Sequence, residues 1–288
     1  MTTIDMVCKV AAFPDPCATS VIRTAPACDG PLPPLAPLAG EQLLVGKGER
    51  ARTGILLIHR VGGAPGEMHE LARGLNEQGY SVMAVRLAGH CGSLQELAGA
   101  GWMDWLDSVR RGADTLASRT DRVVVGGIST GAVLALALAQ ERPFHVTGVL
   151  ALSPVLRHDG RAGPHRASTA FLLPVLRVLG ISRHRALPGR LRRAGLPGTP
   201  WGALGQMRKL AAAVLRRMDM VRAPCLVIHA RHDDVATVSG AFEIAKTARN
   251  TNVHLQLLAD REHVITMGRG CGDVVSRATA FVSGIAWP

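Results

Sequence analysis

One stretch, Val123 to Ala135, constrains the fold more than any other part of this 288-residue chain. It begins with a β-branched apolar run, a pattern typical of a strand buried on both faces of a sheet. Small residues follow, and then an alanine- and leucine-rich run that favours a helix. Ser129 lies at the junction, within Gly127-Ile128-Ser129-Thr130-Gly131. This is the nucleophile-elbow pattern, in which a sharp strand-to-helix turn exposes one hydroxyl above the sheet and glycines keep the bend uncrowded.

The alternation of strand and helix continues on both sides of this stretch. Short apolar runs predict strands at Arg52–His59, Tyr80–Arg86, Val146–Leu152, Pro224–Ala230 and Val253–Leu258. Helical spacing of apolar residues predicts helices at Glu67–Gln78, Trp102–Ala117, Thr237–Arg249 and Cys271–Ile285. Strands that alternate with helices predict an α/β fold, with a mostly parallel sheet covered by helices on both faces.

Two segments depart from this rhythm. Residues 1–40 are rich in proline and alanine and predict an extended arm. Residues 153–220 are basic and broken by prolines, and they predict a helical cap inserted into a core formed by 41–152 and 221–288. In this cap, Phe171–Leu176 and Val178–Leu179 can line an apolar acyl site. Its arginines form either an ordinary solvated face or a site for anions. These are Arg183, Arg185, Arg190, Arg192 and Arg193.

Composition and charge indicate which kinds of binding partner to expect. The net charge is +11, but only 3% of residues are aromatic and no nucleic-acid recognition motif accompanies the arginines, so we expect no nucleic-acid partner. A weak attraction to anionic surfaces is the milder interpretation. None of the six cysteines forms a CxxC pair, which argues against a zinc or redox site. With neither a secretory signal nor an apolar run that could span a bilayer, a cytoplasmic location is expected. The oligomeric state is not indicated.

A serine nucleophile needs a histidine base and a carboxylate that orients it. In the order serine, acid, histidine, the acid is expected after the strand ending at Ala230, where Asp233 and Asp234 stand. The histidine is expected after the last strand, where His263 stands. Asp233 is preferred, and Asp234 remains the alternative because a shift of one residue exchanges them. Asp260 is expected to begin a turn. Five other histidines are expected to have no catalytic role. His59, His90, His229 and His254, at strand ends or in loops, are expected to be structural, and His232 to pack or face solvent.

Several short segments carry a family resemblance: Ala230–Val235, His263–Thr266, Arg222–Pro224, and Leu87–His90 with the later Trp102-x-x-Trp105. From about Gly40 to its end, the chain resembles the bacterial carboxylesterase and monoacylglycerol lipase branch of the α/β-hydrolases. The resemblance implies hydrolysis of short- to medium-chain esters or monoglycerides, with no metal or organic cofactor. It implies that Ser129 is the nucleophile, His263 the general base and Asp233 the acid. The backbone N–H groups of Val61 and Thr130 would form the oxyanion hole.

The chain departs from the family in two loops. Family members usually read His-Gly-Phe where this chain reads His59-Arg60-Val61. The Arg60 side chain is expected to face solvent; alternatively it caps the pocket and favours an acidic ester. Where the family reads Gly-His-Gly, this chain has Gly89-His90-Cys91, in a loop that is expected to be structural. Trp102, Trp105 and Leu106, farther along the chain, are expected in the core.

Two other functions stay open at this level. The same triad could serve an acyltransferase or thioesterase, because an acyl-enzyme can be resolved by another acceptor. Arg60 also keeps open a non-catalytic scaffold that binds a ligand or partner, since the fold hosts many functions.

Overall fold

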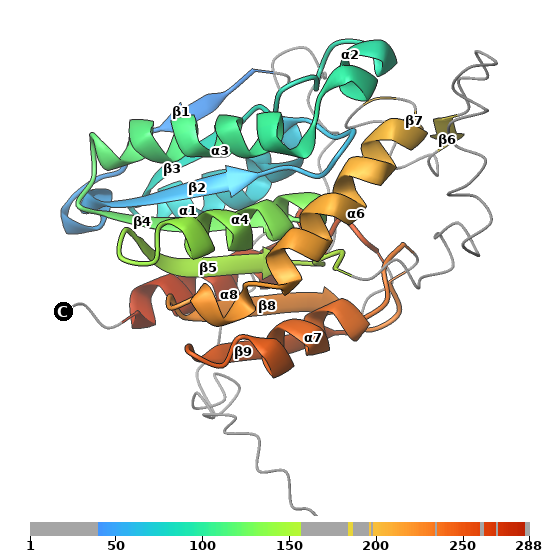
Figure 1. Cartoon of the computed structure of the whole chain (residues 1–288). Helices are drawn as coiled ribbons and strands as arrows, with labels where there is room; N and C mark the ends of the chain where they lie inside the picture. The colour runs from blue at the N-terminus through green and yellow to red at the C-terminus, as the bar shows by residue number, and fades with distance from the viewer. Residues whose placement is uncertain are drawn as a thin grey trace, which may run out of the picture.

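The computed structural model describes residues 40–156, 184–186, 196, 198–233, 235–259, 262–268 and 270–285. A seven-stranded sheet with strand order β1-β3-β2-β4-β5-β8-β9 forms its centre (Figure 1). Only β1 runs antiparallel to its neighbour, and the other adjacent pairs are parallel. The strands are β1 (Gln42–Leu44), β2 (Thr53–Ile58), β3 (Ser81–Val85), β4 (Arg122–Ile128), β5 (Val146–Leu152), β8 (Cys225–Ala230) and β9 (Val253–Leu258). The mostly parallel α/β fold predicted from the sequence is therefore confirmed.

Helices cover both faces of this sheet (Figure 1). One face carries α3 (Trp102–Ala117), α4 (Thr130–Glu141), α6 (Trp201–Leu215) and α7 (Ser239–Thr247), and the other carries α1 (His69–Glu77) and α8 (Cys271–Gly284). A short helix, α2 (Leu94–Gly99), precedes α3. Three 3-10 turns complete the described helical segments: η2 (Glu49–Arg52), η3 (Pro65–Met68) and η5 (Met218–Met220).

Two hydrophobic cores lie on opposite faces of the sheet because successive residues of a strand point to opposite sides. In β2, Leu56 and Ile58 pack in the core under α3 and α4, whereas Ile55 and Leu57 pack in the core under α1 and α8. Trp105 is fully buried in the first of these cores, as expected, with Leu106 beside it and Trp102 packed against its margin. Burial on both faces explains why these strands read as continuous apolar runs.

The segment expected to form the cap is described only in part. Its described elements are an antiparallel pair, β6 (His184–Ala186) with β7 (Gly198–Pro200), followed by α6 and η5. Helix α6 packs against α4, where Gln140 Nε2 donates to the backbone oxygen of Val214 over 2.9 Å. The apolar residues Phe171–Leu176 and Val178–Leu179 lie outside the described residues, as do Arg183, Arg190, Arg192 and Arg193 and the arm up to residue 39.

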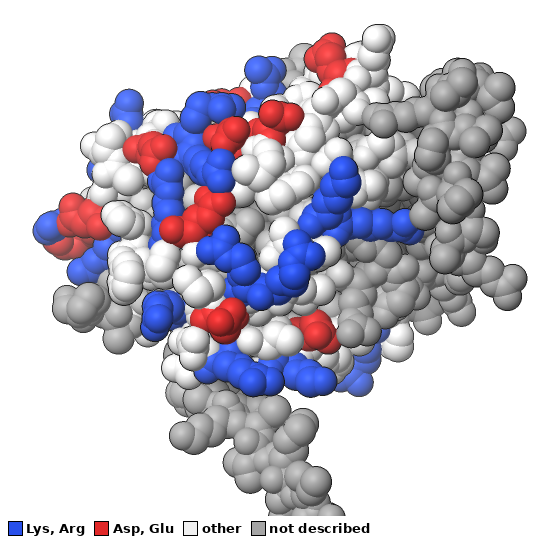
Figure 2. Space-filling model, viewed as in Figure 1, with Lys and Arg blue, Asp and Glu red and all other residues white. Residues whose placement is uncertain are grey.

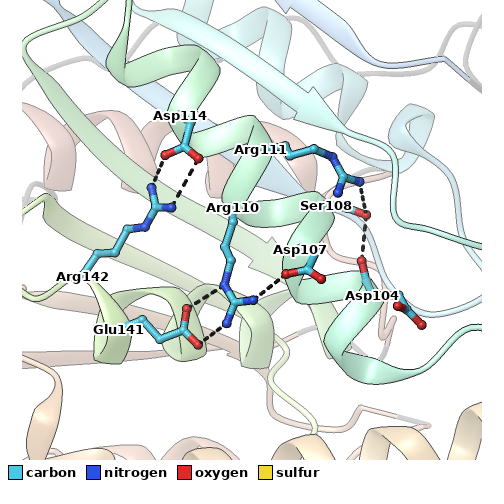
Figure 3. A network of polar contacts seen from close by, with 8 residues as sticks. All are labelled: Asp104, Asp107, Ser108, Arg110, Arg111, Asp114, Glu141 and Arg142. Atoms are coloured by element: carbon cyan, nitrogen blue, oxygen red, sulfur yellow. Dashed lines mark hydrogen bonds and ion pairs between the residues drawn. The ribbon is translucent and has the colours of Figure 1, made fainter.

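Acidic and basic side chains are interspersed on the face that carries α3, α4 and α6 (Figure 2). Arg110 of α3 forms a two-pronged pair with Glu141 of α4, at 2.9 and 2.6 Å, and Arg142 pairs with Asp114 (Figure 3). Such partly exposed pairs contribute only about 0–1 kcal/mol each. In these pairs each arginine has an acidic side chain as its neighbour. Within the described ranges, no helix combines the length and the hydropathy needed to cross a membrane.

Candidate active site

The turn between β4 and α4 has the backbone strain that a nucleophile elbow requires. Ser129 adopts φ 57° and ψ −117°, a region that side chains other than glycine rarely enter. A Cβ added at Gly127 would lie 2.3 Å from the carbonyl group of Gly131. A Cβ at Gly131 would lie 2.2 Å from the backbone oxygen of Ile58. Both glycines are therefore needed for the start of α4 to pack directly against β4 and the end of β2.

Backbone hydrogen bonds hold the elbow in place. The N–H of Ser129 donates to the oxygen of Leu152 at the end of β5, and the oxygen of Ser129 accepts from the N–H of Ala132. These bonds span 2.8 and 3.2 Å. Ser129 and Thr130 are both buried, so the hydroxyl and the first N–H groups of α4 lie in a site largely shielded from water. This shielding strengthens any electrostatic interaction made there.

Asp233 follows β8 and contacts His263, which follows β9. The His263 Nδ1 lies 2.7 Å from Asp233 Oδ2, and both side chains are almost fully buried. The other carboxylate oxygen, Oδ1, accepts the backbone N–H groups of Val235 and Ala236, each over 2.8 Å. Burial alone would raise the pKa of Asp233. Hydrogen bonds from His229, His263 and the backbone outweigh it and hold the pKa well below its usual range. Asp233 is therefore ionised at neutral pH.

His229 also reaches Asp233, a contact that the sequence analysis missed. Its side chain is fully buried at the end of β8, and its Nε2 lies 3.3 Å from both Asp233 Oδ2 and the backbone oxygen of Ala236. The expectation of a structural histidine did not include a contact with the candidate acid. The available signal was the four-residue spacing of His229 and Asp233 across a strand end. His232, between them, is exposed.

The candidate residues gather at one edge of the sheet, because the carboxyl ends of parallel strands meet there. Ser129 follows β4, Asp233 follows β8 and His263 follows β9. The Nε2 of His263 is buried and has no hydrogen-bond partner among the described residues, Ser129 included. The alternative acid Asp234 and the turn residue Asp260 lie outside the described residues.

The expectation that Arg60 faces solvent is wrong. Its side chain is only 5% exposed, and its Nε lies 2.8 Å from Oε1 of Glu67, which is fully buried in η3. The guanidinium turns inward because Glu67 offers a carboxylate beneath the loop that follows β2. Val61 is buried in the same loop. Since Ile58 of β2 pairs with Gly127 of β4, Val61 and Thr130 follow the ends of adjacent strands.

The two histidines near this loop are structural, as expected. His59 Nδ1 lies 2.8 Å from the oxygen of Arg60, and its Nε2 accepts the N–H of Leu87 over 3.2 Å. The His90 ring packs edge-on between His59 and Trp105, with centroid distances of 4.9 and 5.9 Å. Burial lowers the pKa of His59 well below its ordinary value and that of His90 to about 4, so both are neutral at pH 7.

The buried Glu67 carboxyl predicts a pH dependence of stability. Burial raises its pKa to about 7, although Arg60 opposes the shift. Between the unfolded pKa and about 7, the folded state holds a proton that the unfolded chain has lost, so its contribution to stability is complete at low pH and declines as pH rises. We expect the stability of the wild type relative to Glu67→Gln to fall by about 2–3 kcal/mol from about pH 5 to about pH 8. Urea unfolding of both proteins across this range measures the difference, and a constant difference would contradict the raised pKa.

Comparison with known proteins places this geometry in a family. The family model described as serine aminopeptidase, S33, matches residues 49–269. A thermostable monoacylglycerol lipase of Bacillus sp. (strain H-257) is 26% identical over 233 residues, which cover 81% of this chain and 91% of that protein. A carboxylesterase of Bacillus subtilis (strain 168) is 24% identical over 234 residues, covering 81% and 93%.

A solved structure from the metagenome-derived lipolytic enzymes LipS and LipT shares the fold. It superimposes with a TM-score of 0.71 at 23% identity, and the match covers 86% of this chain and 98% of that one. The family match itself spans β2, the elbow, Asp233 and His263. The chain therefore belongs to the S33 serine aminopeptidase family of α/β-hydrolases.

Proposed function

We propose that this protein hydrolyses carboxylic esters through an acyl-enzyme formed on Ser129. The observation that carries the proposal is the 2.7 Å contact of His263 with the ionised Asp233, at the sheet edge where the strained elbow presents Ser129. The two bacterial relatives named above, a monoacylglycerol lipase and a carboxylesterase, each match 81% of this chain, and their names support ester hydrolysis. The substrate class is an ester with an apolar acyl group.

In the first half of the reaction, His263 acts as general base. Asp233 accepts the Nδ1–H of His263, which leaves Nε2 unprotonated and able to take the proton of the Ser129 hydroxyl. The Ser129 oxygen attacks the ester carbonyl, and the carbonyl oxygen becomes negatively charged. The N–H groups of Val61 and Thr130 donate to that oxyanion. His263 then gives its proton to the leaving alcohol as the carbon–oxygen bond breaks.

In the second half, water replaces the alcohol. His263 removes a proton from a water molecule that attacks the acyl-enzyme, and the same N–H groups stabilise the second tetrahedral intermediate. Its collapse releases the carboxylic acid and returns the proton to Ser129. An acyltransferase would share every step up to the acyl-enzyme and differ in the acceptor that resolves it. A thioesterase would differ in the first half, because the group that leaves is a thiol.

The wider organisation belongs to the same proposal. Residues 41–152 and 221–288 form the hydrolase core, 153–220 cap the acyl site, and 1–40 form an N-terminal arm. The compartment proposed is the cytoplasm. Free thiols suit this compartment, and Cys91 and Cys225 form no disulfide among the described residues.

A panel of p-nitrophenyl esters from acetate to laurate, with a monoacylglycerol, tests the proposal. We expect turnover of at least one of these esters and covalent labelling by a fluorophosphonate probe, which reacts with activated serines. Addition of a competing alcohol separates hydrolysis from acyl transfer, because a transferase converts the alcohol to a new ester. A protein that neither turns over the panel nor reacts with the probe would support a non-catalytic scaffold.

A further inference from the structure

Arg60 and Glu67 form a buried pair beneath the loop that follows β2, and the pair is ionic at a pH above the Glu67 pKa of about 7. Their side chains are 5% and 0% exposed, and the Arg60 Nε lies 2.8 Å from Glu67 Oε1. Moving two charges out of water costs free energy, so a buried pair is weak evidence for stability. Both side chains also form hydrogen bonds with the backbone of the loop.

The pair holds the backbone on both sides of the peptide that carries the Val61 N–H. Glu67 Oε2 accepts the N–H of Arg60 over 3.3 Å. Arg60 Nη1 donates to the oxygen of Val61 over 3.1 Å. The first contact fixes the peptide group before the Arg60–Val61 peptide, and the second fixes the group after it.

The Arg60–Val61 peptide is itself fixed through its oxygen. That oxygen lies 2.8 Å from His59 Nδ1 and accepts the N–H of Gly63 over 3.1 Å. Because His59 Nε2 accepts the N–H of Leu87, its proton lies on Nδ1 and is donated to Arg60. In a trans peptide the N–H points away from the C=O. A fixed Arg60 oxygen therefore fixes the direction of the Val61 N–H.

Glycine residues make room for this arrangement. Gly62 adopts φ 73°, which favours glycine, and lets the chain turn directly after Val61. A Cβ added at Gly63 would lie 2.2 Å from Glu67 Oε2, so the carboxylate rests against the backbone of Gly63. An alanine at position 63 would displace the carboxylate without changing either charge.

We propose that Arg60 and Glu67 are positioning residues that hold the Val61 N–H in the oxyanion hole. The proposal rests on the proposed function, since it deepens the role of the same site. The buried Glu67 carboxylate neutralises the Arg60 guanidinium and ties it to the loop. The guanidinium is engaged by Glu67 and shielded from solvent, which fits a role in positioning the loop.

A positioning role predicts an effect on kcat. The oxyanion hole stabilises the tetrahedral intermediate far more than the bound ester, so loosening one donor lowers kcat while KM changes little. Loss of a whole oxyanion donor costs about 100–1000-fold in kcat. Loosening Val61 without removing it is expected to cost about 10–100-fold.

The experiment compares Glu67→Gln, Arg60→Met, their double variant and Gly63→Ala with the wild type, using p-nitrophenyl butyrate. We expect each single variant to lower kcat by about 10–100-fold, with KM within about threefold of the wild type. The double variant should be no worse than the poorer single variant by more than about threefold, because residues that act as a unit are not additive. Affinity for a trifluoromethyl ketone, whose adduct with Ser129 places an oxyanion in the hole, should fall in parallel with kcat.

Two control variants separate positioning from general loss of stability. Arg110→Met breaks a partly exposed pair with Glu141. Gly99→Ala adds a Cβ that meets no described atom within 4 Å beyond its own helix and chain neighbours. Both should keep kcat within about twofold of the wild type. Thermal unfolding of every variant fixes an assay temperature at which all are folded. Gly63→Ala keeps both charges, so it tests the inference even where a charge variant is unstable.

The outcomes separate the two proposals. A wild type that hydrolyses esters alongside variants with unchanged kcat would overturn the positioning role alone. An increase in KM with unchanged kcat would overturn it too, because it would mean that the pair binds substrate. A wild type that shows no turnover and no fluorophosphonate labelling would overturn the proposed function, whatever the variants do.

Discussion

Replacing Ser129 by alanine is expected to lower kcat/KM for p-nitrophenyl butyrate by about 10⁴–10⁶-fold and to abolish fluorophosphonate labelling. The substitution removes the oxygen atom that attacks the ester, and the proposed site assigns no other group as a nucleophile for the acyl group. The fold should survive it, because the Ser129 side chain makes no capping hydrogen bond to α4 within the described part of the chain. Alanine also suffers the same φ of 57° as serine, so the strain is unchanged.

Ser153 supplies the matched control for this experiment. It follows the neighbouring strand β5, is fully buried and adopts φ 43°. Its hydroxyl has no hydrogen-bond partner among the described residues. Ser153→Ala should therefore keep kcat/KM within about threefold of the wild type. A Ser129→Ala protein that retains more than about 1% of the wild-type rate, after exclusion of contaminating esterase, contradicts the nucleophile assignment.

The features that the sequence could predict are those set by short-range pattern. The elbow is one, because thirteen consecutive residues, Val123 to Ala135, hold the apolar strand run, the turn and the start of the helix. Each glycine of the turn also has a steric reason that follows from the bend. The order of Asp233 and His263 after two later strands is another. Parallel strands bring their carboxyl ends to one edge, so a position after a strand converts directly into a place in the fold.

The features that the sequence could not predict depend on which side chain meets which. Arg60 reads as a surface residue until the turn at η3 brings Glu67 beneath it, and composition offers no sign of that contact. His229 alternates within a buried strand like any core residue, and only the fold shows that Asp233 turns back toward it. The short strand β1 and helix α2 were also missed, because three and six residues carry too little periodicity to detect.

Asp233→Asn carries the second large effect, an expected loss of about 10⁴-fold in kcat. The carboxylate uses Oδ1 to accept two backbone N–H groups and Oδ2 to accept from His263 and His229. Asparagine can keep the first pair of bonds through its oxygen, which places its NH₂ group against the two histidines. That group cannot accept the Nδ1–H of His263. The neutral imidazole then carries its proton on Nε2, and a protonated Nε2 cannot accept the proton of the Ser129 hydroxyl.

Asp234→Asn turns this experiment into a choice between adjacent residues. If Asp233 is the acid, Asp234→Asn should change kcat by no more than about threefold, while Asp233→Asn shows the full loss. The reverse pattern would identify Asp234 as the acid and contradict the role given to Asp233. The tautomer argument adds a second measurement, since NMR of the imidazole protons should show the proton of His263 moving from Nδ1 to Nε2 in Asp233→Asn. A loss of activity with the proton still on Nδ1 would mean that Asp233 acts through the structure of its turn, and not through His263.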